Sequence, residues 1–224
     1  MGEMISYKRP DGKQANGYLA NPAAGQSAPG IVVIQEWWGL TDQIKGVCDR
    51  YAAAGYRALA VDLYDGTVTK DPDEAGKLMN STNFIEAAEQ YVGGAVDHLK
   101  ATGSSKVAVT GFCMGGAVTV ISAVKVPQAD AAACFYGIPP ASVADPKDIK
   151  IPFIGHFADH DEFFSADMTN ALEEGLKAGG AKSAVYRYDA QHAFANEQRP
   201  EVYNEAAAKQ AWERTISFLK DNIG

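Results

Sequence analysis

Cysteine is scarce in this chain, which has three among its 224 residues. Cys48, Cys113 and Cys134 are an odd number and lack the spacing of a disulfide framework. Small secreted domains that depend on disulfides are much richer in cysteine. The count therefore excludes a disulfide scaffold and predicts a reducing compartment. Buried packing is the default role of Cys48 and Cys134.

Long apolar segments and clusters of positive charge are also lacking. No stretch reaches the roughly 18 apolar residues of a membrane span, and the first residues, MGEMISYKRPDGK, hold no apolar core of a secretion signal. We therefore expect a cytoplasmic protein. The 20 Lys and Arg residues are outnumbered by 28 Asp and Glu, for a net charge of −8. Phosphate-rich partners need a basic patch, so nucleic acids and membrane surfaces are excluded. A small-molecule substrate and a monomer or weak homo-oligomer are expected.

Short apolar runs alternate with helical patterns through most of the chain. After a hairpin expected at 5–22, candidate buried strands lie at 31–34, 58–61, 106–110, 131–136, 152–157 and 183–188. Helical patterns lie at 41–54, at 73–99 with a polar interruption at 80–83, and at 117–124, 166–177 and 201–220. This alternation implies a mostly parallel sheet with helices on both faces. The length fits one large unit, so a single α/β domain is expected over 1–224.

A glycine-flanked cysteine follows the strand expected at 106–110. The stretch reads Gly111-Phe112-Cys113-Met114-Gly115-Gly116. A nucleophile between strand and helix is the context of the G-x-S-x-G nucleophile elbow, here with cysteine in place of serine. So sharp a turn strains the nucleophile's backbone and leaves no room for a Cβ on the flanking glycines. The alternative is a small buried cysteine in a glycine-rich turn.

Carboxylates and a histidine follow other expected strands, at the edge where open parallel sheets bind ligands. Glu36 follows the first buried strand, Asp161 a later one, and His192 the last. The order Cys113, Asp161, His192 is the nucleophile–acid–base order of α/β-hydrolases. Asp159 is an alternative acid two residues before Asp161.

The histidines also raise the question of a metal. His156, His160 and His192 occur with Asp159 and Asp161, but no zinc-type spacing is present. No metal or other cofactor is therefore expected. We expect His160 at the rim of the site, and His98 and His156 in structural roles.

The chain resembles the dienelactone hydrolase (carboxymethylenebutenolidase) family from the first hairpin to the last helix. Four stretches carry the resemblance: Gln35-Glu36-Trp37-Trp38-Gly39, the cysteine elbow, Asp161-Glu162-Phe163 and His192-Ala193-Phe194-Ala195. It implies an α/β-hydrolase that cleaves a carboxylic ester of the lactone type. It also implies that Cys113 is the nucleophile, His192 the general base and later acid, and Asp161 the carboxylate that orients His192. Backbone N–H groups of Met114 and Trp37 would form the oxyanion hole.

Glu36 is the least ordinary member of this set. A carboxylate beside a cysteine raises the pKa of the thiol, which is the wrong direction for a nucleophile. The resemblance implies that Glu36 holds the resting thiol and accepts its proton once substrate moves the carboxylate. Such gating would protect the sulfur from oxidation. The alternative is a solvated acidic residue after a strand.

Aromatic residues around these motifs predict an apolar substrate pocket, with walls from Trp38, Phe112, Phe163 and Phe194. Family members that use dienelactones resemble one another in an arginine four residues after the catalytic histidine, which serves the substrate carboxylate. Asn196 stands there in this chain and is neutral. Arg199 and Lys77 are candidate replacements. We therefore expect neutral lactones or esters to be preferred to dienelactone.

Two other functions remain open at this point. One is a general carboxylesterase or thioesterase for neutral acyl substrates. The other is a non-enzymatic thiol sensor or binding module. An intact Cys113, His192 and Asp161 set argues against a degenerate fold, and Glu36 opposes the low thiol pKa that a sensor requires.

Overall fold

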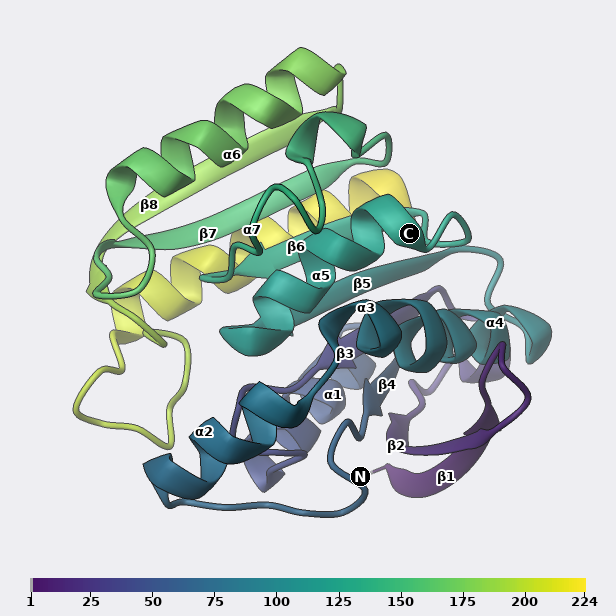
Figure 1. The fold of residues 1–224 in the computed structure, drawn as a ribbon. Coiled ribbons are helices and arrows are strands. Elements are labelled where there is room, and N and C mark those ends of the chain that lie inside the picture. The colour runs from purple at the N-terminus through teal and green to yellow at the C-terminus, as the bar shows by residue number, and fades with distance from the viewer. Residues whose placement is uncertain (1) are drawn as a thin grey trace.

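The computed structural model describes residues 2–224, and within them eight strands form one twisted sheet (Figure 1). The order is β1-β2-β4-β3-β5-β6-β7-β8. β1 (Glu3–Lys8) and β2 (Gln14–Ala20) form an antiparallel hairpin, and β2 also runs antiparallel to β4 (Arg57–Val61). All other pairs are parallel, through β3 (Gly30–Ile34), β5 (Val107–Phe112), β6 (Ala131–Phe135), β7 (Phe153–His160) and β8 (Ser183–Gln191). The expected single α/β domain with a mostly parallel sheet is confirmed.

Helices cover both faces of this sheet (Figure 1). One face packs on α1 (Asp42–Ala53) and α7 (Glu205–Asn222). The other packs on α4 (Gly93–Ala101), α5 (Met114–Lys125) and α6 (Ala166–Gly179). The central strands β3, β4, β5 and β6 are buried along their whole length, which explains their unbroken apolar runs.

The long helical pattern at 73–99 is divided in the structure. It contains α2 (Pro72–Ser81), the single turn α3 (Phe84–Glu86), a π-helical segment (Ala87–Val92) and then α4. Asn83 caps the start of α3, because its side chain accepts hydrogen bonds from the backbone N–H groups of Ile85 and Glu86 at 3.1 Å each. No helix in the described residues is long and apolar enough to cross a membrane.

Several expected boundaries near the site are wrong. β7 and β8 continue to His160 and Gln191, so Asp159 lies within a strand rather than after one. The last helix begins at Glu205 rather than 201, since the Asn204 side chain caps it by accepting from Ala207 N at 3.1 Å. α5 begins at Met114, directly after the cysteine.

Candidate active site

The cysteine elbow lies between β5 and α5 with a strained backbone. Cys113 has φ 55° and ψ −117°, outside the regions that side-chain-bearing residues favour. A Cβ on Gly111 would overlap the backbone of Gly115, and one on Gly115 would overlap the carbonyl oxygen of Ile34 at the end of β3. The expected steric reason for both glycines is therefore confirmed. The elbow is fitted directly against the strand that leads to Glu36.

The sulfur of Cys113 sits in an environment that disfavours the thiolate. Burial raises the pKa of the thiol well above its ordinary value, and the charge of Glu36 raises it further. The backbone N–H of Met114 acts in the opposite direction, because it donates to the sulfur. The residue as a whole is partly exposed, so a small molecule can reach it. Burial and the charge of Glu36 thus both favour the neutral thiol over the thiolate.

His192 and Asp161 are joined by a hydrogen bond between Nδ1 and Oδ2 at 2.8 Å. The carboxylate of Asp161 is 1 % exposed, and its Oδ1 accepts from the backbone N–H groups of Phe163 at 2.8 Å and Phe164 at 3.2 Å. These donors fix the orientation of the carboxylate. Asp159, the alternative acid, has an exposed position on β7. The structure thus brings Asp161, and not Asp159, to the imidazole.

The other imidazole nitrogen is left free. With Nδ1–H donating to Asp161, Nε2 is the nitrogen that can accept a proton. Nε2 is buried and has no hydrogen-bond partner in the described part of the chain. Nε2 therefore makes no hydrogen bond to the thiol of Cys113 in this structure. Such contacts commonly tighten only when substrate is bound.

Glu36 is buried, with 3 % of its surface exposed. Its Oε2 accepts from Asn196 Nδ2 at 2.8 Å, and its Oε1 lies 3.5 Å from the hydroxyl of Tyr136. Burial raises the pKa of the carboxyl group, whereas the Asn196 hydrogen bond and the nearby His192 lower it. The alternative of a solvated acidic residue is wrong. Glu36 is a buried carboxylate held by neutral donors.

Asn196, an expected pocket residue, is hydrogen-bonded to Glu36 in this structure. It is 5 % exposed, and its amide nitrogen is used by Glu36. Its Oδ1 accepts from the backbone N–H of Gln198 at 3.0 Å. Both ends of the Asn196 amide are therefore engaged within the protein.

The aromatic residues divide between core and pocket. Phe112 and Phe194 are 5 % and 0 % exposed and belong to the core on the α1/α7 side, and their expected role as pocket walls stays a prediction. Phe163 is 58 % exposed and its ring centroid lies 4.8 Å from that of His192. Trp38 is partly buried and packs edge-on against Trp37 at 4.9 Å. Phe163 and Trp38 remain as candidate pocket residues.

Two tyrosines near the nucleophile were missed from the sequence. Tyr136 follows β6 and is fully buried, with its ring centroid 5.1 Å from that of His192. Tyr64 follows β4, and its hydroxyl donates to the sulfur of Met114 at 3.2 Å. Burial raises the pKa of Tyr64 to about 12. The only sign of these tyrosines in the sequence was that each follows a strand ending at the sheet edge that carries the candidate site.

The remaining histidines and cysteines lie apart from this group. His156 is fully buried, and its ring nitrogens contact the Tyr188 hydroxyl at 2.8 Å and Thr215 Oγ1 at 2.9 Å. Burial lowers its pKa to about 3, so it is a neutral structural residue. His98 lies near the C-terminus of α4, as expected. Cys48 and Cys134 are fully buried.

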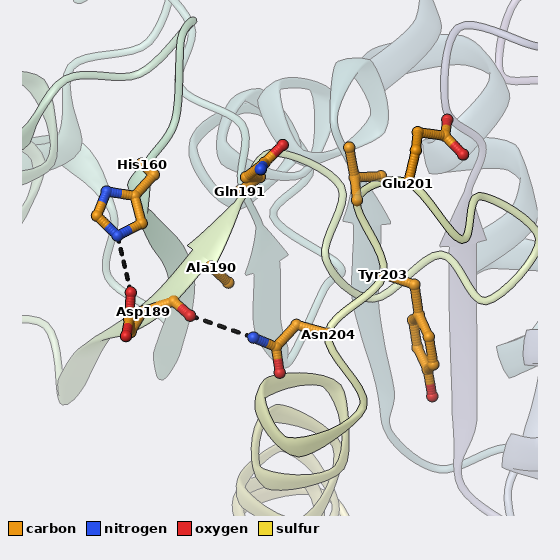
Figure 2. A pocket seen from close by; sticks show the side chains of 8 residues that line it. His160, Asp189, Ala190, Gln191, Glu201, Tyr203 and Asn204 are labelled. Atoms are coloured by element: carbon orange, nitrogen blue, oxygen red, sulfur yellow. Dashed lines mark hydrogen bonds and ion pairs between the residues drawn. The ribbon is translucent and has the colours of Figure 1, made fainter.

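A surface cavity of about 230 Å³ adjoins the site (Figure 2). Its lining residues are His160, Asp189, Ala190, Gln191, Glu201, Val202, Tyr203 and Asn204. His160 is exposed and pairs with Asp189 at 2.7 Å, and the neighbouring Asp161 and His192 do not line the cavity. In the described residues, no three or more His, Cys, Asp or Glu side chains are grouped to hold a metal ion.

Known proteins match this sequence over nearly its whole length. The sequence model of the dienelactone hydrolase family matches residues 15–223. Protein usf of Aquifex pyrophilus is 38 % identical over all of both chains. A protein of Aquifex aeolicus, 34 % identical over 98 % of each chain, carries the provisional name carboxymethylenebutenolidase.

Solved structures share the fold as well. A crystal structure from Klebsiella pneumoniae, provisionally titled a dienelactone hydrolase, has a TM-score of 0.82 and 25 % identity over 98 % of this chain and 99 % of that one. A dienelactone hydrolase-like promiscuous phosphotriesterase from metagenomic libraries has a TM-score of 0.84 at 21 % identity, covering 100 % of this chain and 99 % of that one. The family model matches nearly the whole chain, and the strained cysteine elbow lies within the matched residues. The chain therefore belongs to the dienelactone hydrolase family and is a carboxylic ester hydrolase.

Proposed function

We propose that this hydrolase cleaves a lactone or a similar small ester through an acyl-thioester on Cys113. The observation that carries the proposal is the hydrogen bond of 2.8 Å between His192 Nδ1 and Asp161 Oδ2, with Nε2 left free at the edge that holds the strained cysteine. An aspartate on Nδ1 fixes the imidazole tautomer in which Nε2 accepts a proton. Nucleophile, base and orienting acid are thus supplied by three different strand ends.

In this mechanism, substrate binding frees Glu36 from its donors so that it takes the proton of the thiol. The sulfur then attacks the carbonyl carbon, and the backbone N–H groups of Met114 and Trp37 hold the oxyanion. Each such donor is typically worth ~10²–10³ in rate. Glu36 passes the thiol proton to Nε2 of His192, which gives it to the leaving oxygen. His192 then takes a proton from the water that attacks the thioester and returns it to the departing sulfur, so the thiol is restored. The raised pKa of the resting thiol supports a gate of this kind.

Replacing Glu36 with glutamine should lower the pKa of Cys113. Glutamine removes the negative charge that raises this pKa, while the burial of the sulfur is unchanged. We expect the pH profile of the iodoacetamide labelling rate to shift to lower pH by about one to two pH units. Glu197→Gln is the matched control, because that glutamate is exposed and screened by water. A wild-type thiol that is already ionised at pH 6 would contradict the gate.

We also propose that the preferred substrates are neutral. Asn196 offers no charge, and Glu36 has no ion-pair partner in the described residues. Loss of one charged partner in a partly buried site costs ~30- to 150-fold in kcat/KM, so dienelactone should be used weakly compared with a neutral lactone of similar size. Asn196→Arg should narrow that difference, chiefly through KM, because a remote carboxylate is bound alike in the ground and transition states. Steady-state kinetics on both substrates measure this effect.

Arg199 provides the critical comparison for this prediction. Its guanidinium bonds Glu201 at 2.8 Å and lies 5.7 Å from the ring centre of Trp38. If Arg199 holds a substrate carboxylate, wild type will prefer dienelactone, Arg199→Gln will lose that preference, and Asn196→Arg will gain nothing. Lys77 is exposed on α2 and serves as the neutral-effect control through Lys77→Gln.

A general carboxylesterase or thioesterase for neutral acyl groups is the second candidate. The lack of a cation paired with Glu36 and the exposed Phe163 ring beside His192 favour it over a strict dienelactone enzyme. A panel of dienelactone, neutral lactones, p-nitrophenyl esters and acyl thioesters separates the two. A lactone enzyme should show its highest kcat/KM on a cyclic ester, and a general esterase on an open-chain one.

A further inference from the structure

Backbone strain in this protein is concentrated around the candidate nucleophile. Among the described residues, four other than glycine have a positive φ: Asp65, Cys113, Tyr136 and Ala193. Cys113 is the elbow residue and Ala193 directly follows His192. Strained conformations persist where the surrounding structure enforces them, and they gather at functional sites. Asp65 and Tyr136 belong to no motif discussed above, and Tyr136, with φ 37°, is the one of the two whose ring packs against His192.

Tyr136 lies between His192 and Glu36, the two groups that handle protons in the proposed mechanism. It is fully buried, its ring packs edge-on against His192 at 5.1 Å, and it contacts Phe194 at 5.3 Å. Its hydroxyl lies 3.5 Å from Glu36 Oε1. The backbone N–H of Ala195 donates to the same hydroxyl oxygen. With that lone pair occupied, the hydroxyl proton is free to be donated to the carboxylate.

We propose that Tyr136 is a positioning residue that holds Glu36 in its resting place and thereby keeps the proton on Cys113. Its O–H donates to one carboxylate oxygen while Asn196 donates to the other, and both bonds favour an ionised Glu36 that cannot take the thiol proton. When substrate displaces the carboxylate of Glu36, the carboxylate loses both hydrogen bonds. Its pKa then rises, and Glu36 becomes a stronger base. The inference rests on the proposed function, since it concerns the control of the same nucleophile.

Other charged groups face this pair and must be held constant in any test. His192 and Arg199 act on Glu36 across the site, and Glu36 and Asp161 both act on Cys113. Asn196 contributes a neutral donor from the loop after β8. A change in the Cys113 profile therefore reports on Tyr136 only if it disappears when Glu36 can no longer accept a proton.

The test is Tyr136→Phe, which removes the hydroxyl and keeps the ring. In the wild-type background, iodoacetamide labelling of Cys113 should shift to lower pH by about 0.5 to 1 unit, hence roughly 3- to 10-fold faster at pH 7. In a Glu36→Gln background the same substitution should change nothing further. Tyr51→Phe is the matched control, because Tyr51 is equally buried but packs on Trp212. Melting curves should show that all variants fold.

The outcomes distinguish this inference from the proposed function. An unshifted profile in Tyr136→Phe, or a shift of equal size in the Glu36→Gln background, overturns the positioning role. So does an equal shift in Tyr51→Phe. If Cys113→Ala still hydrolyses esters, the proposed function fails and this inference with it. If Cys113→Ala is inactive and only the Tyr136→Phe profile is unchanged, the triad stands and the role of Tyr136 alone is rejected.

Discussion

Cys113→Ala and His192→Ala are each expected to reduce kcat by ~10⁴–10⁶, and the double variant should be little worse than either. In the proposed mechanism the two residues act as one unit: without sulfur there is no acyl-thioester, and without the imidazole no group passes the proton to the leaving oxygen. His192 is suited to this role because Asp161 binds Nδ1 at 2.8 Å and leaves Nε2 free.

The measurement is steady-state hydrolysis of the best ester in the substrate panel. Cys134→Ala is the matched control for the loss of a thiol, because that sulfur is fully buried and donates to the carbonyl oxygens of Gly116 and Gly137. Its activity should stay near wild type if the protein folds. More than a tenth of wild-type kcat in Cys113→Ala would end the claim that this cysteine is the nucleophile.

Asp161→Asn is the second large effect, with an expected loss of ~10²–10⁴ in kcat. An amide in place of the carboxylate favours the wrong imidazole tautomer and no longer stabilises the imidazolium that forms during the reaction. The geometry should be preserved, because an amide oxygen can still accept from Phe163 and Phe164. The loss should therefore appear in kcat more than in KM.

Asp159→Asn is the control for this substitution. Its side chain is exposed on β7, so the change should leave kcat within about twofold of wild type, as surface substitutions usually do. The expected ranking is His192→Ala most damaging, then Asp161→Asn, and Asp159→Asn least. The reverse order of the two aspartates would assign the orienting role to Asp159.

The sequence was most informative where a short local pattern decides the structure. Unbroken apolar runs predicted the strands that are buried on both faces, and the two glycines of the elbow predicted the strained turn at Cys113. The ends of β7 and β8 were not predictable in the same way. There the strands continue as an exposed pair, with His160 opposite Gln191, and no apolar pattern marks exposed residues.

Contacts between distant residues account for the other errors. Asn196 and Glu36 are 160 positions apart, and their hydrogen bond depends on how the last loop folds over the sheet. Nothing local separates an aromatic residue of the core from one of the pocket, so Phe112 and Phe163 looked equivalent although one is 5 % and the other 58 % exposed. Tyr136 had no motif at all, and only its backbone and contacts draw attention to it.

The close fit of the elbow against the end of β3 also limits how the site can move. Gly115 has no room even for a methyl group beside Ile34, so the main chain at Cys113 and at Glu36 is held in one rigid block. Release of the glutamate must then be a rotation about side-chain bonds rather than a displacement of a loop. Rotations of this kind belong to faster timescales than loop or domain closure. The protein would thus respond to its substrate without a slow conformational phase before turnover.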